Sequence, residues 1–413
     1  MFRGKWTTVV ALLGASIVAQ SAVAATPAGA STPGVTRNTI TLGLITELTG
    51  PASAETTGMV PSAEARIALQ NAEGGVDGRK IKLIVKDDQT SPAADQSASA
   101  ALVSEGVFGV LDESAVTFGG YKLLQQRGIP VTGGAYDGPE WYQQPNTNMF
   151  SFTGPGDAKD PQYTNTAVFA KEHGGTKCGS VGYAISPSSQ ASATGFDFAC
   201  AKEGLKNAYL NNSLPFGSIN VTTLVLQLKA AGVNALYLPL DENTNFAIMT
   251  ALKQAGVNMK VIINATGYGQ SLVTDTSAAP DAQGAWFLGT GAPVELKSAA
   301  TKSFQAALKK YAHYTGVPDF SWYEGWGSAD LMIKGLELAG RNPTQANFIS
   351  ALHKVSSYDV NGIENPVNLT LARFGKAPTK LCEYLTQFKG DAFVNPTNVC
   401  GSLIPNSDQL PSA

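Results

Sequence analysis

The chain is poor in the residues that build reactive and metal centres. Its 413 residues include three histidines and four cysteines, and no two cysteines have Cys-x-x-Cys spacing. Charged residues make up 15% of the chain, the formal net charge is −3, and Lys and Arg form no dense run. This composition argues against nucleic-acid binding. Metalloprotease, serine-hydrolase, phosphate-loop and dinucleotide motifs are also missing, so we expect no enzyme, no cofactor and no metal.

The first residues have the pattern of a secretion signal. Arg3 and Lys5 precede an uncharged, largely apolar stretch over 7–19, and Ala22-Val23-Ala24 supplies small residues for cleavage after Ala24. That stretch is shorter than the roughly 20 residues of a membrane span. No cysteine follows the cut directly, so we expect no lipid anchor. The sequence therefore predicts an exported protein, soluble in the periplasm or another extracytoplasmic space, with 25–34 as a disordered leader.

Removal of this signal leaves 389 residues (413 − 24), with 27 basic and 32 acidic side chains. A chain of this length favours roughly two or three domains. An even number of cysteines in an oxidising compartment indicates two disulfides. Of the three possible connectivities we expect the local pairs, Cys178–Cys200 and Cys382–Cys400. Each would close a loop of about 20 residues, contributing ~3 kcal/mol. A metal site built from all four thiolates is the alternative.

Strand-like and helix-like segments alternate after residue 35. Short strands separated by helices predict parallel sheets with right-handed crossovers, and therefore an α/β fold. The expected strands are 40–45, 81–85, 107–111, 129–131, 181–185, 235–240, 260–263, 285–288, 359–370 and 382–388. The expected helices are 61–72, 93–104, 117–126, 162–173, 193–207, 223–231, 246–254, 298–314, 322–339 and 345–355.

Several motifs occur in a characteristic order along the chain. They are Leu48-Thr49-Gly50-Pro51, Gly74-Gly75-Val76-Asp77-Gly78-Arg79-Lys80-Ile81, Asp87-Asp88-Gln89, Gly128-Ile129-Pro130-Val131, Leu228-Lys229-Ala230-Ala231-Gly232 and the stretch 251–256. Together they resemble the type I periplasmic solute-binding proteins, specifically the branched-chain amino acid (leucine/isoleucine/valine) binding family of ABC transporters. The resemblance covers nearly all of the chain beyond the signal.

This resemblance implies two doubly wound parallel-sheet lobes joined by a three-crossover hinge. Lobe one would comprise 35–152 plus 286–355, and lobe two 153–285 plus 356–413. Crossovers would fall near 153–156, 282–285 and 356–360. It also implies capture of a small polar organic ligand (amino-acid-like, amide or carboxylate) between the lobes, followed by hinge closure and delivery to an ABC permease by a monomer. A ligand-sensing ectodomain or signalling adaptor of the same fold is the alternative.

The family's ligand loops in lobe one follow its third and fourth strands. The matching stretches here are 113–117 and 133–137, so the resemblance implies ligand contacts by Ser114, Ala135, Tyr136 and Asp137. A hydroxyl and free N–H groups at a helix N-terminus suit an anion. The alternative is that Ser114 and Thr117 only cap the following helix.

In lobe two the expected contacts are Gln190, Asp241, Thr266 and Tyr268. Amino-acid-binding members carry an acidic partner for the ligand's ammonium group where this chain has Thr266, so an α-amino acid is in question as the ligand. Asp241, Glu47 or Glu55 could supply the missing charge, or could be solvated turn residues.

Other conspicuous side chains have ordinary structural explanations as well. Aromatic faces suit apolar or cationic parts of a ligand, but the same side chains could simply pack in the core. This applies to Tyr136, Trp141, Tyr268, Trp322, Tyr323 and Trp326. Asp87-Asp88 could form a cation site or an acid pair, but the pair is more typical of the end of a strand. The three histidines are more typical of surface residues than of metal or substrate ligands.

Overall fold

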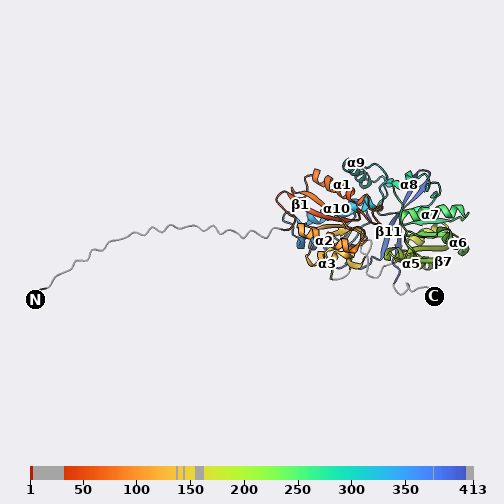
Figure 1. Cartoon of the computed structure of the whole chain (residues 1–413), viewed down its shortest axis with the longest axis horizontal. Helices are drawn as coiled ribbons and strands as arrows, with labels where there is room; N and C mark the ends of the chain where they lie inside the picture. The colour runs from red at the N-terminus through yellow and green to blue at the C-terminus, as the bar shows by residue number, and fades with distance from the viewer. Residues whose placement is uncertain (3–31, 136–137, 143–144, 154–161, 375, 406–413) are drawn as a thin grey trace. The chain divides into compact units, whose positions relative to one another are not determined.

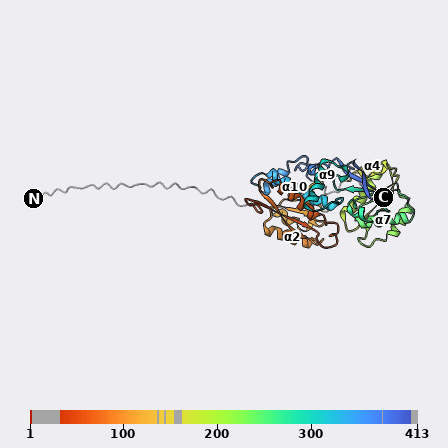
Figure 2. The same cartoon turned by 90° about the horizontal axis from the view of Figure 1, so that it is seen from above.

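The structure is a computed structural model that describes residues 1–2, 32–135, 138–142, 145–153, 162–374 and 376–405. Thr32–Ala413 form one compact unit. It contains two sheets, each flanked by helices (Figures 1 and 2), which confirms the predicted α/β class. Tyr136 and Asp137 lie outside the described residues, as does nearly all of the predicted secretion signal.

The first sheet is wholly parallel, with the order β2-β1-β3-β4-β5. Its strands are β1 (Thr39–Thr46), β2 (Lys80–Asp87), β3 (Val110–Glu113), β4 (Val131–Gly133) and β5 (Met149–Ser151). Strand β1 is buried along most of its length, as a central parallel strand requires. The carboxyl ends of these strands share one edge.

Helices cover both faces of the first sheet. They are α1 (Met59–Ala72), α2 (Pro92–Glu105), α3 (Tyr121–Gln126), α9 (Ala299–Tyr311), α10 (Phe320–Ala339) and α11 (Gln345–Leu352). Helix α10 packs on α1, β3 and β4, whereas α2 packs on α3, β1 and β2. A buried ion pair joins α1 to α10, with Arg66 Nε 2.7 Å from Asp330 Oδ1. Tyr358 Oη donates to Asp330 Oδ2 at 2.7 Å, so both carboxylate oxygens are matched.

The glycine-rich motif before β2 forms a tight turn. Val76 and Arg79 exchange backbone hydrogen bonds, both 2.9 Å long. Between them Asp77 and Gly78 have φ of 49° and 79°. Two consecutive positive φ values define a type I′ turn, for which Asp-Gly is a favoured pair. The turn therefore explains why Asp and Gly occupy these two positions of the motif.

The second sheet has the order β12-β11-β10-β9-β8-β6-β7, and it is parallel except where β11 pairs with β10 and β12. Its strands are β6 (Lys177–Tyr183), β7 (Lys206–Leu214), β8 (Ala235–Leu238), β9 (Val261–Asn264), β10 (Trp286–Gly289), β11 (Lys380–Lys389) and β12 (Ala392–Ser402). Its helices are α4 (Asn165–Glu172), α5 (Pro187–Lys202), α6 (Val221–Ala231), α7 (Glu242–Gln254) and α8 (Gln270–Thr274). The predicted helix over 223–231 and strand from 235 are confirmed as α6 and β8, and Gly232, with a φ of 69°, ends the helix between them.

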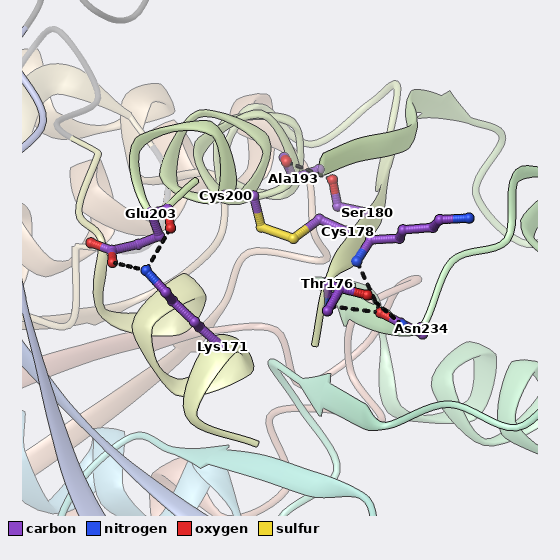
Figure 3. The surroundings of a disulfide bond; sticks show 9 residues. Lys171, Thr176, Cys178, Ser180, Ala193, Cys200, Glu203 and Asn234 are labelled. Carbon is purple, nitrogen blue, oxygen red and sulfur yellow. Dashed lines mark hydrogen bonds and ion pairs between the residues drawn. A yellow bond between two sulfur atoms is a disulfide. The ribbon is translucent and has the colours of Figure 1, made fainter. Parts of the chain in front are cut away.

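Both predicted disulfides are present in the structure. Cys178–Cys200 joins the start of β6 to the end of α5, and Cys382–Cys400 links facing residues of β11 and β12. Figure 3 shows the first bond with Ser180, whose hydroxyl donates to Ala193 O at 2.7 Å and ties β6 to α5 a second time. The four-thiolate metal alternative is therefore wrong.

Three details of the predicted organisation are wrong. Residue 286 was expected to begin the return to lobe one, but β10 pairs with β9 and β11 and so belongs to the second sheet. The segment 359–370 was expected as a strand, yet it holds a single helical turn and one isolated bridge, Tyr358 with Val367. Residues 206–207 were assigned to a helix, whereas they begin β7. Local patterns do not reveal which sheet a short strand joins.

Candidate functional site

Loops from both sheets meet at the N-terminus of α10. The backbone N–H of Gly58, just before α1, donates to Ser321 Oγ at 2.9 Å. On the side of the second sheet, Gln270 N–H donates to Val317 O at 2.9 Å, and Val317 N–H donates to Gln270 Oε1 at 2.9 Å. The loops that precede Gly58 and Gln270 follow the carboxyl ends of β1 and β9. In open parallel sheets this edge is where ligands bind.

Asp319 lies at the centre of this meeting point. Its Oδ1 accepts the N–H of Ser321 at 2.9 Å and the hydroxyl of Ser321 at 2.6 Å, so it caps α10. Gly269 packs closely against it, because a Cβ added at Gly269 would lie 2.6 Å from Asp319 Cβ. Only glycine fits at this point, where φ is 159°. The loop after β9 is therefore held against the start of α10.

Two further carboxylates come from the loop after β8. Asp241 caps α7, accepting Thr244 N–H at 3.0 Å and the hydroxyl of Tyr183. Glu242 accepts the hydroxyl of Ser271 at 2.9 Å. Burial and repulsion from Asp319 and Asp241 raise the pKa of Glu242 despite that hydrogen bond.

Glu55, in the loop after β1, faces this acidic group from the first sheet. Its side chain is exposed, and no described residue forms a hydrogen bond with it. Desolvation by the surrounding protein, followed by repulsion from Asp241 and Glu242, raises the pKa of Glu55 to about 7. Glu55 is therefore close enough to Asp241 and Glu242 to be coupled to them electrostatically.

Basic side chains are missing from most of the loops that carry these acids. The loops that follow β1–β4 and β6–β9 contain no Lys, Arg or His. The segment after β5 contains Lys159, which lies outside the described residues. No Lys or Arg contributes to the pKa shifts of Glu55, Glu242 or Asp319. Taken together, the loops after β1–β4 and β6–β9 are therefore acidic, whereas the segment that carries Asp319 contains His313 and the loop after β10 contains Lys297.

The sequence matches a family model over most of its length. The model described as periplasmic binding protein covers residues 39–391. The chain belongs to this family. The match includes the whole first sheet, strands β6–β11 of the second sheet and every loop that meets at α10, so these loops lie within the part of the chain that defines the family.

Curated relatives and solved structures support this assignment. The periplasmic binding protein is 25% identical, over 319 residues, to Leu/Ile/Val-binding protein homolog 3 of Brucella melitensis biotype 1, covering 76% of this chain and 83% of the relative. A fatty acid ABC transporter substrate-binding protein from Thermomonospora curvata has a similar fold, with a TM-score of 0.73, 19% identity, and coverage of 92% of this chain and 96% of that chain. A solute-binding protein from R. palustris in complex with benzoate has a TM-score of 0.69 and 15% identity, covering 90% and 99% respectively. These structural likenesses establish the type I periplasmic binding protein fold.

The structure places the expected lobe-one residues at the carboxyl edge of the first sheet. Ser114 is buried, and its Oγ accepts Val116 N–H at 2.9 Å in a local turn. The helical segment that follows is a single turn, Thr117–Gly119, so no long helix directs its N-terminus at an anion here. Ala135 is half-buried with a left-handed φ of 60°. The contacts predicted for Tyr136 and Asp137 fall outside the described residues.

The expected lobe-two residues divide into two groups. Asp241 and Thr266 lie at the loops described above, and Thr266 Oγ1 donates to Leu240 O at 2.7 Å. Gln190 lies within α5, where its Nε2 donates to Asn212 O of β7 at 3.0 Å. Tyr268 is 3% exposed, and its hydroxyl donates to Glu295 Oε2 at 2.7 Å. The last two side chains therefore brace the fold around the loops.

The aromatic side chains divide in the same way. Trp141, Tyr323 and Trp326 are buried in hydrophobic clusters. Trp322 stacks on Tyr314 with ring centroids 4.0 Å apart. This stacked pair borders the loop junction, because Asp319 contributes to the raised pKa of Tyr314 after desolvation.

A separate group of acids lies buried beneath the edge of the first sheet. Asp95 and Ser99 on α2 and Asp112 on β3 are wholly buried, and no described residue donates to their side-chain oxygens with normal hydrogen-bond geometry. Burial, followed by repulsion from Asp88, raises the pKa of Asp95 to about 8; the nearby N–H of Gly120 offsets this only in part. Burial and repulsion from Asp95 hold the pKa of Asp112 well above its usual range.

Sequence reasoning missed Asp319 and Tyr183 as parts of the site. A usable signal for Asp319 was its place before a long helix after Pro318, where an Asp is a typical N-cap. Tyr183 had no such signal, because its contact with Asp241 joins residues far apart in sequence. Among the described residues, no group of three or more His, Cys, Asp or Glu could hold a metal ion. No described helix is long and apolar enough to cross a membrane.

Proposed function

We propose that this periplasmic binding protein captures a small organic solute between the loops that meet at Asp319 and delivers it to an ABC permease. The observation that carries the proposal is the meeting itself: the loops after β1 and β9 are both hydrogen-bonded to the start of α10. A solute bound there would contact both lobes at once. Its binding energy would then favour a closed arrangement that a permease can recognise.

Among the sequence-derived contacts, we assign Ser114, Ala135, Asp241 and Thr266 to the site, because they lie on loops that end strands of the two sheets. Tyr136 and Asp137 remain predicted contacts. Gln190 and Tyr268 are assigned supporting roles, since hydrogen bonds within the protein already occupy their polar atoms. No catalytic residue is proposed.

Export is part of the same proposal. Residues 1–24 would direct the chain across the membrane and be removed after Ala24, which N-terminal sequencing of the secreted protein would check. The two disulfides are consistent with an oxidising compartment.

Native mass spectrometry of the gently purified protein, followed by denaturation, is the direct test. A stoichiometric, chemically unchanged small molecule that leaves on denaturation supports capture. The same molecule should raise the melting temperature of the emptied protein. An empty protein that gains no thermal stability from a broad solute library would contradict the proposal. The permease step is tested by uptake of the identified solute in cells lacking this chain, with and without the restored gene.

A further inference from the structure

We infer that the captured solute is an organic cation, a protonated amine or similar group on an apolar frame, without a free carboxylate. This inference rests on the proposed function and names its ligand class. Asp241, Glu242 and Asp319 gather around the loop junction, and Glu55 faces them from the first sheet. No basic side chain lies on the loops that follow β1–β4 and β6–β9, and the segment that carries Asp319 contains one, His313. A carboxylate brought into this field would be repelled, whereas a cation would neutralise it.

A buried hydrogen-bond acceptor without a donor among the described residues lies next to Thr266, in the lobe built on the second sheet. The hydroxyl of Thr266 donates to Leu240 O at 2.7 Å, so Thr266 Oγ1 can only accept from Asn245. This fixes the Asn245 amide with Nδ2 toward Thr266, at 3.1 Å. Asn245 Oδ1 is then left wholly buried, with no hydrogen bond from any described residue. Both the charged groups and this neutral acceptor favour a ligand rich in N–H donors.

Apolar side chains beside the acids indicate the rest of the ligand. Phe216 is 50% exposed and packs edge-on against Tyr183, with ring centroids 5.1 Å apart. Tyr183 in turn donates to Asp241, so an exposed aromatic face adjoins a carboxylate. Ile185, in the neighbouring loop after β6, is 76% exposed. Large exposed apolar groups next to a binding edge suit an apolar ligand part.

Near Asp319, the half-buried Tyr314 ring stacks on the buried Trp322, so Tyr314 is the ring of this pair that can offer a second aromatic surface. Aromatic faces attract cations as well as apolar groups. A zwitterionic amino acid would need a positive or N–H-rich partner for its carboxylate. The described loops supply carboxylates and ring faces instead.

The test compares three probes of nearly equal shape by isothermal titration calorimetry on the emptied protein. They are 2-phenylethylammonium, 3-phenylpropionate and phenylalanine. We expect 2-phenylethylammonium to bind, and to bind more weakly as salt rises, with no detectable heat from 3-phenylpropionate. Phenylalanine should bind at least about tenfold more weakly than the amine.

The matched variants are Glu55→Gln and Glu73→Gln. Both residues have exposed carboxylates, but Glu73 follows α1 at the opposite edge of the first sheet. Glu55→Gln should weaken binding of 2-phenylethylammonium about tenfold, and Glu73→Gln should leave it unchanged. Since the only hydrogen bond described for Glu55 comes from its backbone N–H, to Ala52 O at 2.9 Å, replacement of the side chain should not alter folding.

Binding of 3-phenylpropionate in preference to the amine would overturn the inference while leaving solute capture intact. An anionic solute found in the purified protein would do the same, as would an unchanged affinity in Glu55→Gln. If no probe binds and no solute is found in the protein or the library, the proposed function itself fails.

Discussion

Acidic side chains inside the first lobe differ sharply in what surrounds them. Asp330 on α10 is buried but fully matched, with Arg66, Tyr358 and Asn361 directed at its two oxygens. Asp95 and Asp112 are equally buried, and no described residue donates to them with normal hydrogen-bond geometry. Burial is therefore accommodated in two ways: Asp330 has a buried guanidinium as its partner, whereas burial raises the pKa of Asp95 and Asp112.

The carboxyl groups at the loop junction differ both from the matched Asp330 and from the unmatched Asp95 and Asp112. Asp241 and Asp319 accept hydrogen bonds as helix caps, and Glu55 remains exposed to solvent. These groups keep access to water and to one another, so they can respond to a bound charge. The same residue types thus serve structure in one place and recognition in another.

The largest expected effect is loss of the matched buried pair. Asp330→Asn should lower the free energy of unfolding by about 3–5 kcal/mol, because Arg66 would be left buried without its counter-charge. Urea denaturation measures this change. Glu337→Gln, on an exposed position of the same helix, should cost less than about 0.5 kcal/mol. An equal loss of unfolding free energy in the two variants would contradict the distinction between the buried, paired carboxylate and the exposed one.

Removal of the cross-link between β6 and α5 comes next. A Cys178→Ser, Cys200→Ser double variant should lose about 3 kcal/mol, because the bond closes a loop with a sequence separation of 22 residues. This loss should persist at every pH, unlike the effect of the buried acids. Chemical denaturation at two pH values would reveal any departure from that expectation.

Asp95→Asn should raise the free energy of unfolding, whereas the two changes above lower it. The folded-state pKa of Asp95 is raised to about 8 from an ordinary value of 3.8. Between those pH values the folded protein binds the proton more tightly than the unfolded chain, so this group's contribution to stability falls as pH rises. The Asn side chain is neutral at every pH. It should therefore stabilise the protein by about 1–3 kcal/mol at pH 8, and change little at pH 4.

Glu105→Gln is the control for this variant, since Glu105 is exposed on the same helix. Its partly exposed ion pair with Lys86, 2.7 Å long, contributes less than about 1 kcal/mol, so the effect should be small and nearly the same at both pH values. If the free energy of unfolding falls with pH as steeply in Asp95→Asn as in the unchanged protein, Asp95 is ionised in the folded protein and the prediction is contradicted.

The smallest stability effect is expected at the loop junction. Asp241→Ala removes the cap of α7 and should cost about 1 kcal/mol. Ser298→Ala removes the cap of α9 and should cost a similar amount. Only Asp241→Ala should also weaken solute binding. Thermal melts and calorimetry on both variants separate the two effects, and equal binding losses would remove Asp241 from the site.

Much of the fold could be predicted because its signals are local. The Asp77-Gly78 turn, Gly232 at the end of α6 and the two disulfide pairings each follow from residues close in sequence. The sheet assignment of β10 could not be predicted, since pairing partners of a four-residue strand are set by tertiary contacts.

The site was less predictable for the same reason. Asp241 and Glu55 could be proposed as charged loop residues, but their mutual repulsion joins segments almost two hundred residues apart. Gln190 follows a strand and was expected at the ligand. The structure extends α5 back to Pro187, which directs Gln190 toward β7 instead.

Titration of the individual carboxyl groups by NMR, with and without 2-phenylethylammonium, tests the central claim most directly. The pKa of Glu55, raised to about 7 in the empty protein, should fall when the cation binds, whereas Asp95 should titrate unchanged. A Glu55 titration that the cation leaves unmoved, or one that moves only with 3-phenylpropionate, would contradict the account.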